Sequence, residues 1–221
     1  MEILRAFLQD QGIFPVREEL LVQLVTSLTD KENTDQWLHR TFETLLDQDI
    51  SNIMNGGTLP YQLSLVANGI IHGKYLVQLE DVIDIASDEP RKERANGTLK
   101  CTFFDGQQQV YGLELTDMKH CLSVHSAPGT KFLLHDPLVH RGIVLLTRNN
   151  CVCLGGVVVD VQKKRDSLLT EIMQKAMYRV KGFEQPSQSE GGVNNNSRDE
   201  QLIPIGQGIS NFDDYEEEEE D

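Results

Sequence analysis

Four cysteines and a group of histidines are the residues of this chain whose chemistry could extend to metal binding or acid–base catalysis. They are Cys101, Cys121, Cys151 and Cys153, and His120, His125, His135 and His140. Cys151 and Cys153 stand two apart, so on a strand both thiols point to one face, but a zinc site would need two more ligands. The histidines show neither an i, i+4 helical pair nor a neighbouring carboxylate constellation. We therefore expect reduced buried thiols, surface histidines and no metal or other cofactor.

The motifs of common enzyme classes are also absent. The 221 residues contain no nucleophile elbow, P-loop, dinucleotide-binding glycine fingerprint or metalloprotease motif. Gly155-Gly156 lacks the Lys-Ser/Thr that would follow in a phosphate-cradling loop. No run of 18 apolar residues occurs, so we expect no membrane segment, and sparse cysteines in a chain of this length favour a reducing compartment. The sequence predicts a non-enzymatic protein of the cytosol or nucleus.

The net charge of −15 is placed unevenly along the chain. Residues 182–221 hold twelve acidic residues and one basic residue, which is −11, and the remaining body is −4. This tail is rich in Gln, Ser, Gly and Asn, a composition typical of disorder. A nearly balanced body does not predict strong binding to phosphates, so we expect at most a weak DNA contact.

Two segments have helical periodicity. Residues 1–55 contain three apolar stripes at helical spacing, which predict a three-helix module with Asn33 or Thr34 as the cap of its third helix. Residues 56–73 are a connector rich in turns. Residues 161–181 read as a C-terminal helix with one apolar face and one basic face, which a DNA contact or an ordinary solvated face would explain.

Residues 74–160 alternate polar and apolar side chains, as strands do. An Asp105-Gly106 turn joins two of these strands, and a polar turn at 148–150 predicts a hairpin between 143–147 and 151–154. Residues 116–124, between the third and fourth strands, suit a helix or 3₁₀ turn. A five-stranded barrel with an element in that place is the OB fold. The predicted class is α+β: helical module, OB barrel, C-terminal helix and disordered acidic tail.

The order of these motifs resembles a known family. The matching segments are Pro128-Gly129-Thr130-Lys131, Arg141-Gly142-Ile143-Val144-Leu145-Leu146 and Leu154-Gly155-Gly156-Val157. They resemble the N-terminal region of the RecQ-mediated genome instability protein 1 family, over roughly residues 15–181. Proteins of that family are non-catalytic partners of topoisomerase III, a type IA enzyme, and of a RecQ-family helicase, and the complex dissolves double Holliday junctions. The resemblance thus implies a nuclear accessory subunit in DNA repair, recombination and replication.

The same resemblance implies where the partner binds. In the family, an insertion between the first two barrel strands reaches into the topoisomerase gate, and here that position is residues 86–98. The partner-binding residues implied are Asp88, Glu89, Pro90, Arg91, Lys92 and Arg94. This loop is short compared with long-loop members, and an ordinary solvated hairpin loop is the alternative.

Two other functions stay open. One is a stand-alone OB protein that binds single-stranded nucleic acid, although the low aromatic content does not favour a stacking platform. The other is a Tudor-domain-protein-like adaptor of a type IA topoisomerase that acts on RNA.

Overall fold

The N-terminal part of the chain is helical, as the apolar stripes predict. The computed structural model describes residues 1–26, 33–65, 68–89, 91–92 and 97–181, so the tail predicted to be disordered lies outside the described residues. The helices are α1 (Glu2–Asp10), α2 (Glu18–Thr26), α3 (Thr34–Leu46), the short α4 (Ile50–Ile53) and a 3₁₀ turn (Leu63–Leu65). The three-helix expectation therefore missed α4.

Side-chain caps fix where α3 and α4 begin. The Asn33 side chain accepts a hydrogen bond from the Asp35 N–H at 2.9 Å, which confirms Asn33 as the cap of α3. Asp49 caps α4 in the same way, through the Ser51 N–H at 2.9 Å. α4 is only four residues long, so no helical period could announce it in the sequence.

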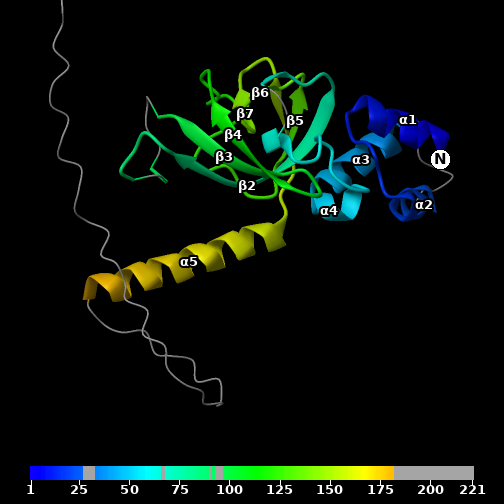
Figure 1. Cartoon of the computed structure of the whole chain (residues 1–221). Helices are drawn as coiled ribbons and strands as arrows, with labels where there is room; N and C mark the ends of the chain where they lie inside the picture. The colour runs from blue at the N-terminus through cyan, green and yellow to red at the C-terminus, as the bar shows by residue number, and fades with distance from the viewer. Residues whose placement is uncertain (27–32, 66–67, 90, 93–96, 182–221) are drawn as a thin grey trace, which may run out of the picture. The chain divides into compact units, whose positions relative to one another are not determined.

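The helices share one apolar core with the first long strand of the sheet. Its buried members are Leu4, Leu8, Ile13, Val16, Leu21, Trp37, Leu38, Leu45, Ile50, Ile53, Met54 and Leu76. Leu76 belongs to β2 and is fully buried among the helical residues, so the helical module is packed onto the sheet. Figure 1 shows α1 to α4 gathered at one end of the sheet.

The described strands form one eight-stranded sheet in the order β1-β6-β7-β4-β3-β2-β5-β8, so the expectation of five strands is wrong. The strands are β1 (Gly69–Ile70), β2 (Lys74–Asp84), β3 (Leu99–Phe104), β4 (Gln109–Glu114), β5 (Lys131–His135), β6 (Leu138–His140), β7 (Ile143–Leu146) and β8 (Cys151–Gly155). The sheet is open, with β1 and β8 as its edges. β3 and β4 pair across the Asp105-Gly106 turn as predicted.

The sheet is strongly curled. Only Asp136 and Pro137 separate β5 from β6, yet these strands stand five places apart in the strand order. A flat sheet would place them roughly 24 Å apart, whereas two residues bridge at most about 10 Å. Curling encloses a second apolar core, in which Phe103 and Phe132 pack edge to face at 5.7 Å.

The predicted hairpin between β7 and β8 does not form. β7 pairs in parallel with β4 and antiparallel with β6, whereas β8 pairs with β5. The turn itself is present: the Asn150 side chain accepts from the Thr147 N–H at 2.8 Å and donates to the Leu145 carbonyl at 2.9 Å. These bonds turn the chain without requiring the two strands to pair, so the strands diverge.

Residues 116–124 form the turn, and not the helix, of the two predicted alternatives. The Cys121 N–H donates to the Met118 carbonyl at 2.9 Å, which is the bond of a 3₁₀ turn. Met118, Leu122 and Val124 are nevertheless buried in the core of the sheet. The spacing of these three apolar residues therefore reflects burial of an irregular segment in the core of the curled sheet, and not one face of a helix.

Two of the family-like motifs meet where α3 ends against the sheet. The Lys131 side chain is fully buried, and its Nζ donates to the Leu46 carbonyl at 2.9 Å and to the Gly129 carbonyl at 2.8 Å. Leu46 ends α3, so this amine satisfies a carbonyl that the helix leaves unpaired. Burial lowers the pKa of Lys131 to about 8, although the negative charges of Asp49 and Asp47 oppose the decrease.

Glycines complete this junction, which we call the α3 joint (residues 46–47, 129–131 and 156–158). Gly156 has φ +82°, and a Cβ there would overlap the Leu46 carbonyl. Gly129 has φ +91°, and a Cβ there would overlap the backbone of Val158. The Val157 N–H donates to Asp47 Oδ1 at 3.0 Å. The motifs Pro128–Lys131 and Leu154–Val157 therefore build the joint between helices and sheet.

After this joint the chain enters α5 (Val159–Lys181), which confirms the predicted C-terminal helix. Figure 1 shows it as a single long helix. None of its described side chains is fully buried; Leu168 and Ile172 are 57% and 53% exposed. No helix within the described ranges is long and apolar enough to cross a membrane.

Candidate partner-binding site

The loop of residues 86–98 connects β2 and β3, which pair antiparallel up to its base. Asp84 closes this base: its Oδ1 accepts from the Ala86 N–H at 2.9 Å and from the Thr98 N–H at 3.0 Å. The Ile85 N–H also donates to the Thr98 carbonyl at 2.9 Å. Asp84 is 1% exposed, so the loop leaves the sheet from a fixed, buried base.

Arg91 is held against the sheet. Its two terminal nitrogens donate to the two carboxylate oxygens of Asp81, each at 2.9 Å. Asp81 follows a register shift in β2, between Leu79 and Asp81, which turns this carboxylate toward the loop. A bidentate pair of this kind fixes orientation as well as charge, so Arg91 anchors the loop rather than presenting a free guanidinium.

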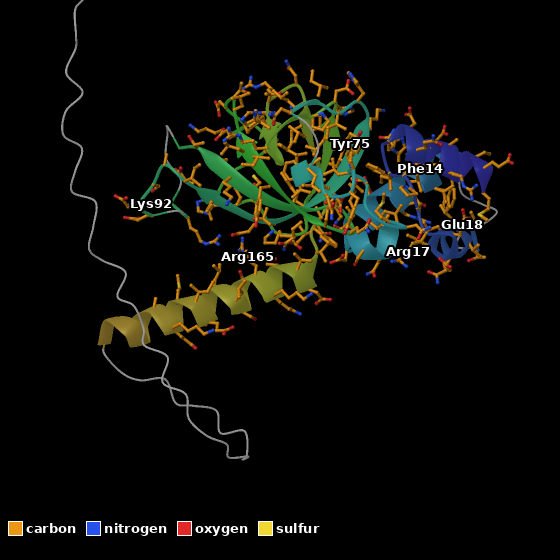
Figure 2. The ribbon with its side chains drawn as sticks, viewed as in Figure 1. Phe14, Arg17, Glu18, Tyr75, Lys92 and Arg165 are labelled. Carbon is orange, nitrogen blue, oxygen red and sulfur yellow. The ribbon has the colours of Figure 1, made fainter. Side chains whose placement is uncertain are left out.

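The tip of the loop is polar and exposed. Lys92 Nζ pairs with Glu89 at 3.1 Å, Ser87 and Glu89 hydrogen-bond locally, and Asp88 faces solvent. Figure 2 shows Lys92 at the end of the sheet opposite the helical module. Pro90 and Arg94 lie outside the described residues. The structure thus groups Glu89, Arg91 and Lys92 on one short projection with mixed charge.

A groove of about 780 Å³ lies beside the loop, between the outer face of β2–β4 and α5. Arg91, Asp81 and Phe104 line its sheet side, and Leu168 and Ile172 line its helix side. Arg165 also lines the groove, and Figure 2 labels it on α5. The groove combines apolar side chains with charges of both signs, which suits a polypeptide better than a uniformly charged ligand.

Charges at the groove are partly buried. Burial raises the pKa of Glu80, although a hydrogen bond from Gln109 at 2.6 Å opposes the rise. Burial acts to raise the pKa of Asp49 too, but hydrogen bonds from Ser51 and Gln78 lower it overall. Lys164 adds a positive charge near Glu80. The groove floor therefore carries organised polar groups next to the exposed apolar stripe of α5.

The thiols and histidines do not form a metal-binding group in the described part of the chain. Burial raises the pKa of the Cys101, Cys121 and Cys151 thiols, so they are poor nucleophiles. All four cysteines are free. Within the described residues, no group of three His, Cys, Asp or Glu side chains is arranged to hold a metal ion.

The outer sheet face offers little for base stacking. Among the aromatic residues of the strands, Phe103 and Phe132 are buried in the core, and Tyr75 and Phe104 are partly buried and packed against the two cores. Tyr111 is exposed, with Lys100 Nζ 4.6 Å from its ring centroid. Single-strand binders usually present several aromatic faces. One tyrosine beside one lysine is a small fraction of such a platform.

Comparison with known proteins shows which family this part of the chain resembles. Residues 86–168 match the family model described as RMI1, N-terminal OB-fold domain. This part of the chain is similar to the OB fold of RMI1. The match begins at the first residue of the loop and ends within α5, so it is narrower than the range 15–181 expected from the motifs. The resemblance to the RecQ-mediated genome instability protein 1 family is confirmed.

Two curated relatives bear the name RecQ-mediated genome instability protein 1. The protein of Oryza sativa subsp. japonica is 27% identical over 140 residues, which are 60% of this chain and 17% of that protein. The protein of Arabidopsis thaliana is 28% identical over 136 residues, 59% of this chain and 21% of that protein. The chain thus spans about a fifth of the length of the curated relatives it matches.

A solved structure described as "Molecular basis for abrogation of activation of pro-inflammatory cytokines" is a distant likeness. It aligns at a TM-score of 0.28 and 10% identity, over 43% of this chain and 48% of that chain. A likeness this weak carries no argument about fold or function.

The groove and the α3 joint were not predicted from the sequence. The groove depends on α5 lying beside the outer face of the sheet, which no periodicity in α5 specifies. The joint did leave a signal, because Gly129, Lys131 and Gly156 belong to the motifs that carry the resemblance. The buried contacts of these motifs lie between parts of the chain about 85 residues apart, which local patterns do not show.

Proposed function

We propose that this chain is a non-catalytic accessory subunit of a complex between a RecQ-family helicase and topoisomerase III. In this proposal it stimulates decatenation and the dissolution of double Holliday junctions, and so supports genome stability in the nucleus. The observation that carries the proposal is the match of residues 86–168 to the RMI1 N-terminal OB-fold domain. The names of the two plant relatives support the link to a RecQ helicase.

The proposed contact is the loop of residues 86–98 together with the neighbouring groove. The described residues of the loop leave the sheet from a buried base at Asp84, and the Arg91–Asp81 pair holds Arg91 in one orientation, which lowers the cost of ordering that side chain on binding. Contact with the topoisomerase would favour one conformation of its gate, which is a population shift in the partner. The chemistry of strand cleavage would belong to the topoisomerase.

Replacement of residues 90–94 by a Gly-Ser linker of equal length tests the role of the loop. We expect topoisomerase III decatenation, stimulated by the whole chain, to fall by roughly tenfold, the equivalent of about 1.4 kcal/mol of lost interaction. The fold is expected to persist, because the bonds of Asp84 lie outside the replaced segment. Circular dichroism and thermal unfolding check the fold.

A five-residue Gly-Ser replacement at 187–191 in the tail is the matched control. Decatenation should remain at the wild-type level in this variant. Unchanged decatenation in a well-folded loop variant would remove the loop from the mechanism, and the groove beside α5 would then be the next surface to alter.

A further inference from the structure

A second hollow of about 580 Å³ lies at the turns that precede β5 and β8, and none of its lining residues belongs to β3 or β4. Its polar lining consists of Lys119, His120, Ser123, Ser126 and Arg148. No described residue that lines it carries a carboxylate, although the whole chain has 35 acidic and 20 basic residues. The hollow is thus a local concentration of positive charge and donors on an acidic protein.

Arg148 is the cation best placed to meet a ligand. It is exposed, and no described residue pairs with its guanidinium group. Its backbone N–H donates to Thr116 Oγ1 at 3.2 Å, which fixes the turn that carries it. Burial raises the pKa of the neighbouring Cys121 thiol and the positive charge of Arg148 opposes that rise, as expected for a guanidinium close to the hollow.

Hydroxyl donors complete the lining. Ser126 Oγ accepts from the Ser123 N–H at 3.0 Å, and Ser123 Oγ accepts from the His125 N–H at 3.2 Å. Because each oxygen acts as an acceptor in these bonds, its own proton is available to donate to a ligand. Lys119 also lines a neighbouring cavity with Asp84 and Glu114. The nearest other acid along the chain is Asp117, which accepts from the Lys119 N–H at 3.0 Å.

We propose that this hollow binds a backbone phosphate of single-stranded DNA. A site with donors, a free guanidinium and no carboxylate selects an anion, and phosphate accepts several such bonds at once. One free guanidinium contributes little to binding a lone phosphate, but such contacts add up along a polyanion. Val152 is 44% exposed at the rim and offers an apolar surface to a sugar or base.

The choice of DNA over a phosphorylated peptide rests on the proposed function, whereas the anion site rests on its lining alone. The site is also separate from the outer faces of β3 and β4, where OB folds ordinarily bind oligonucleotides. It would therefore leave the loop of residues 86–98 free for a protein partner.

Fluorescence anisotropy of a labelled oligo(dT) with the whole chain, at several salt concentrations, tests the proposal. Arg148→Glu should weaken binding on the order of tenfold at low salt and reduce the slope of log K against log[salt] by about 0.7 to 1. Lys163→Glu, at an exposed position on α5, makes the same charge change outside the hollow and should weaken binding by less than about twofold. Arg148→Glu should not affect co-purification with topoisomerase III, so failure here is distinguishable from failure of the proposed function.

Inorganic phosphate is the second probe, followed by amide chemical shifts of Ser123, Ser126 and Arg148. Shifts at these three amides with phosphate, together with DNA binding that Arg148→Glu weakens selectively, would support the proposal. Equal losses in the two charge-reversal variants would overturn it, because overall charge would then explain binding. Phosphate shifts without DNA binding would overturn the DNA assignment and point to a phosphopeptide. If neither phosphate shifts nor DNA binding were observed, the proposed anion site itself would be overturned.

Discussion

Replacing Gly156 by alanine is expected to lower the free energy of unfolding by more than about 3 kcal/mol, whereas the same change at Gly155 should cost about 1 to 2 kcal/mol. Both glycines have positive φ, +82° and +89°, so both variants carry the strain of an L-residue in the left-handed region. Only Gly156 also faces backbone: its Cβ would overlap the carbonyl of Leu46, while a Cβ at Gly155 has nothing within 4 Å. Urea unfolding of the two variants measures the difference.

Gly155→Ala is thus the control for backbone strain, and the difference between the variants reports the close packing at the α3 joint. Because the carbonyl of Leu46 also accepts from Lys131, moving it aside would break a second contact. Equal costs for the two variants would show that the helices and the sheet are not packed as closely at this point as the structure has them.

Raising the pH from 8 to 10.5 is expected to stabilise the wild-type protein by about 3 kcal/mol relative to Lys131→Met. The folded-state pKa of Lys131 is about 8, and its ordinary value is 10.5. Between these two pH values the unfolded chain holds the proton and the folded chain does not. The free energy of unfolding therefore rises by about 1.4 kcal/mol for each unit of pH. Below pH 8 the amine is charged in both states, and the cost of its burial is present in full.

Deprotonation leaves the joint intact, since a neutral amine still has two N–H donors for the carbonyls of Leu46 and Gly129. Subtracting the Lys131→Met curve removes the titration of the other lysines, tyrosines and thiols. Denaturant unfolding of both proteins across this range supplies the curves. Parallel curves would mean that Lys131 is not buried with a depressed pKa.

Local sequence patterns predicted where helices, strands and turns occur better than they predicted which strands pair. The Asn33 cap, the turn at Asp105-Gly106 and the extent of α5 follow from interactions within a few residues. The prediction that β7 pairs with β8 was wrong because the side-chain hydrogen bonds of Asn150 define a turn whether or not the flanking strands pair. The parallel pairing of β7 with β4 joins segments about 30 residues apart, and only the curled sheet as a whole selects it.

The candidate site was predictable to a different degree in each of its parts. The position of the loop followed from the resemblance, but the role of Arg91 did not, because Asp81 reaches it only after the register shift in β2. Arg91 and Lys92 are neighbours in the same basic run, yet one anchors the loop and the other lies at its exposed tip. Side-chain partners of this kind depend on the geometry of the strand below the loop.

Co-purification of the whole chain with topoisomerase III at moderate salt, beside a single-stranded DNA titration of the free chain, distinguishes an accessory subunit from a stand-alone DNA-binding protein. We expect a stable complex with the topoisomerase, and only weak, salt-sensitive binding of DNA by the free chain. Tight DNA binding by the free chain with no topoisomerase complex would contradict the proposed function, and the OB fold would then be a nucleic-acid-binding domain acting alone.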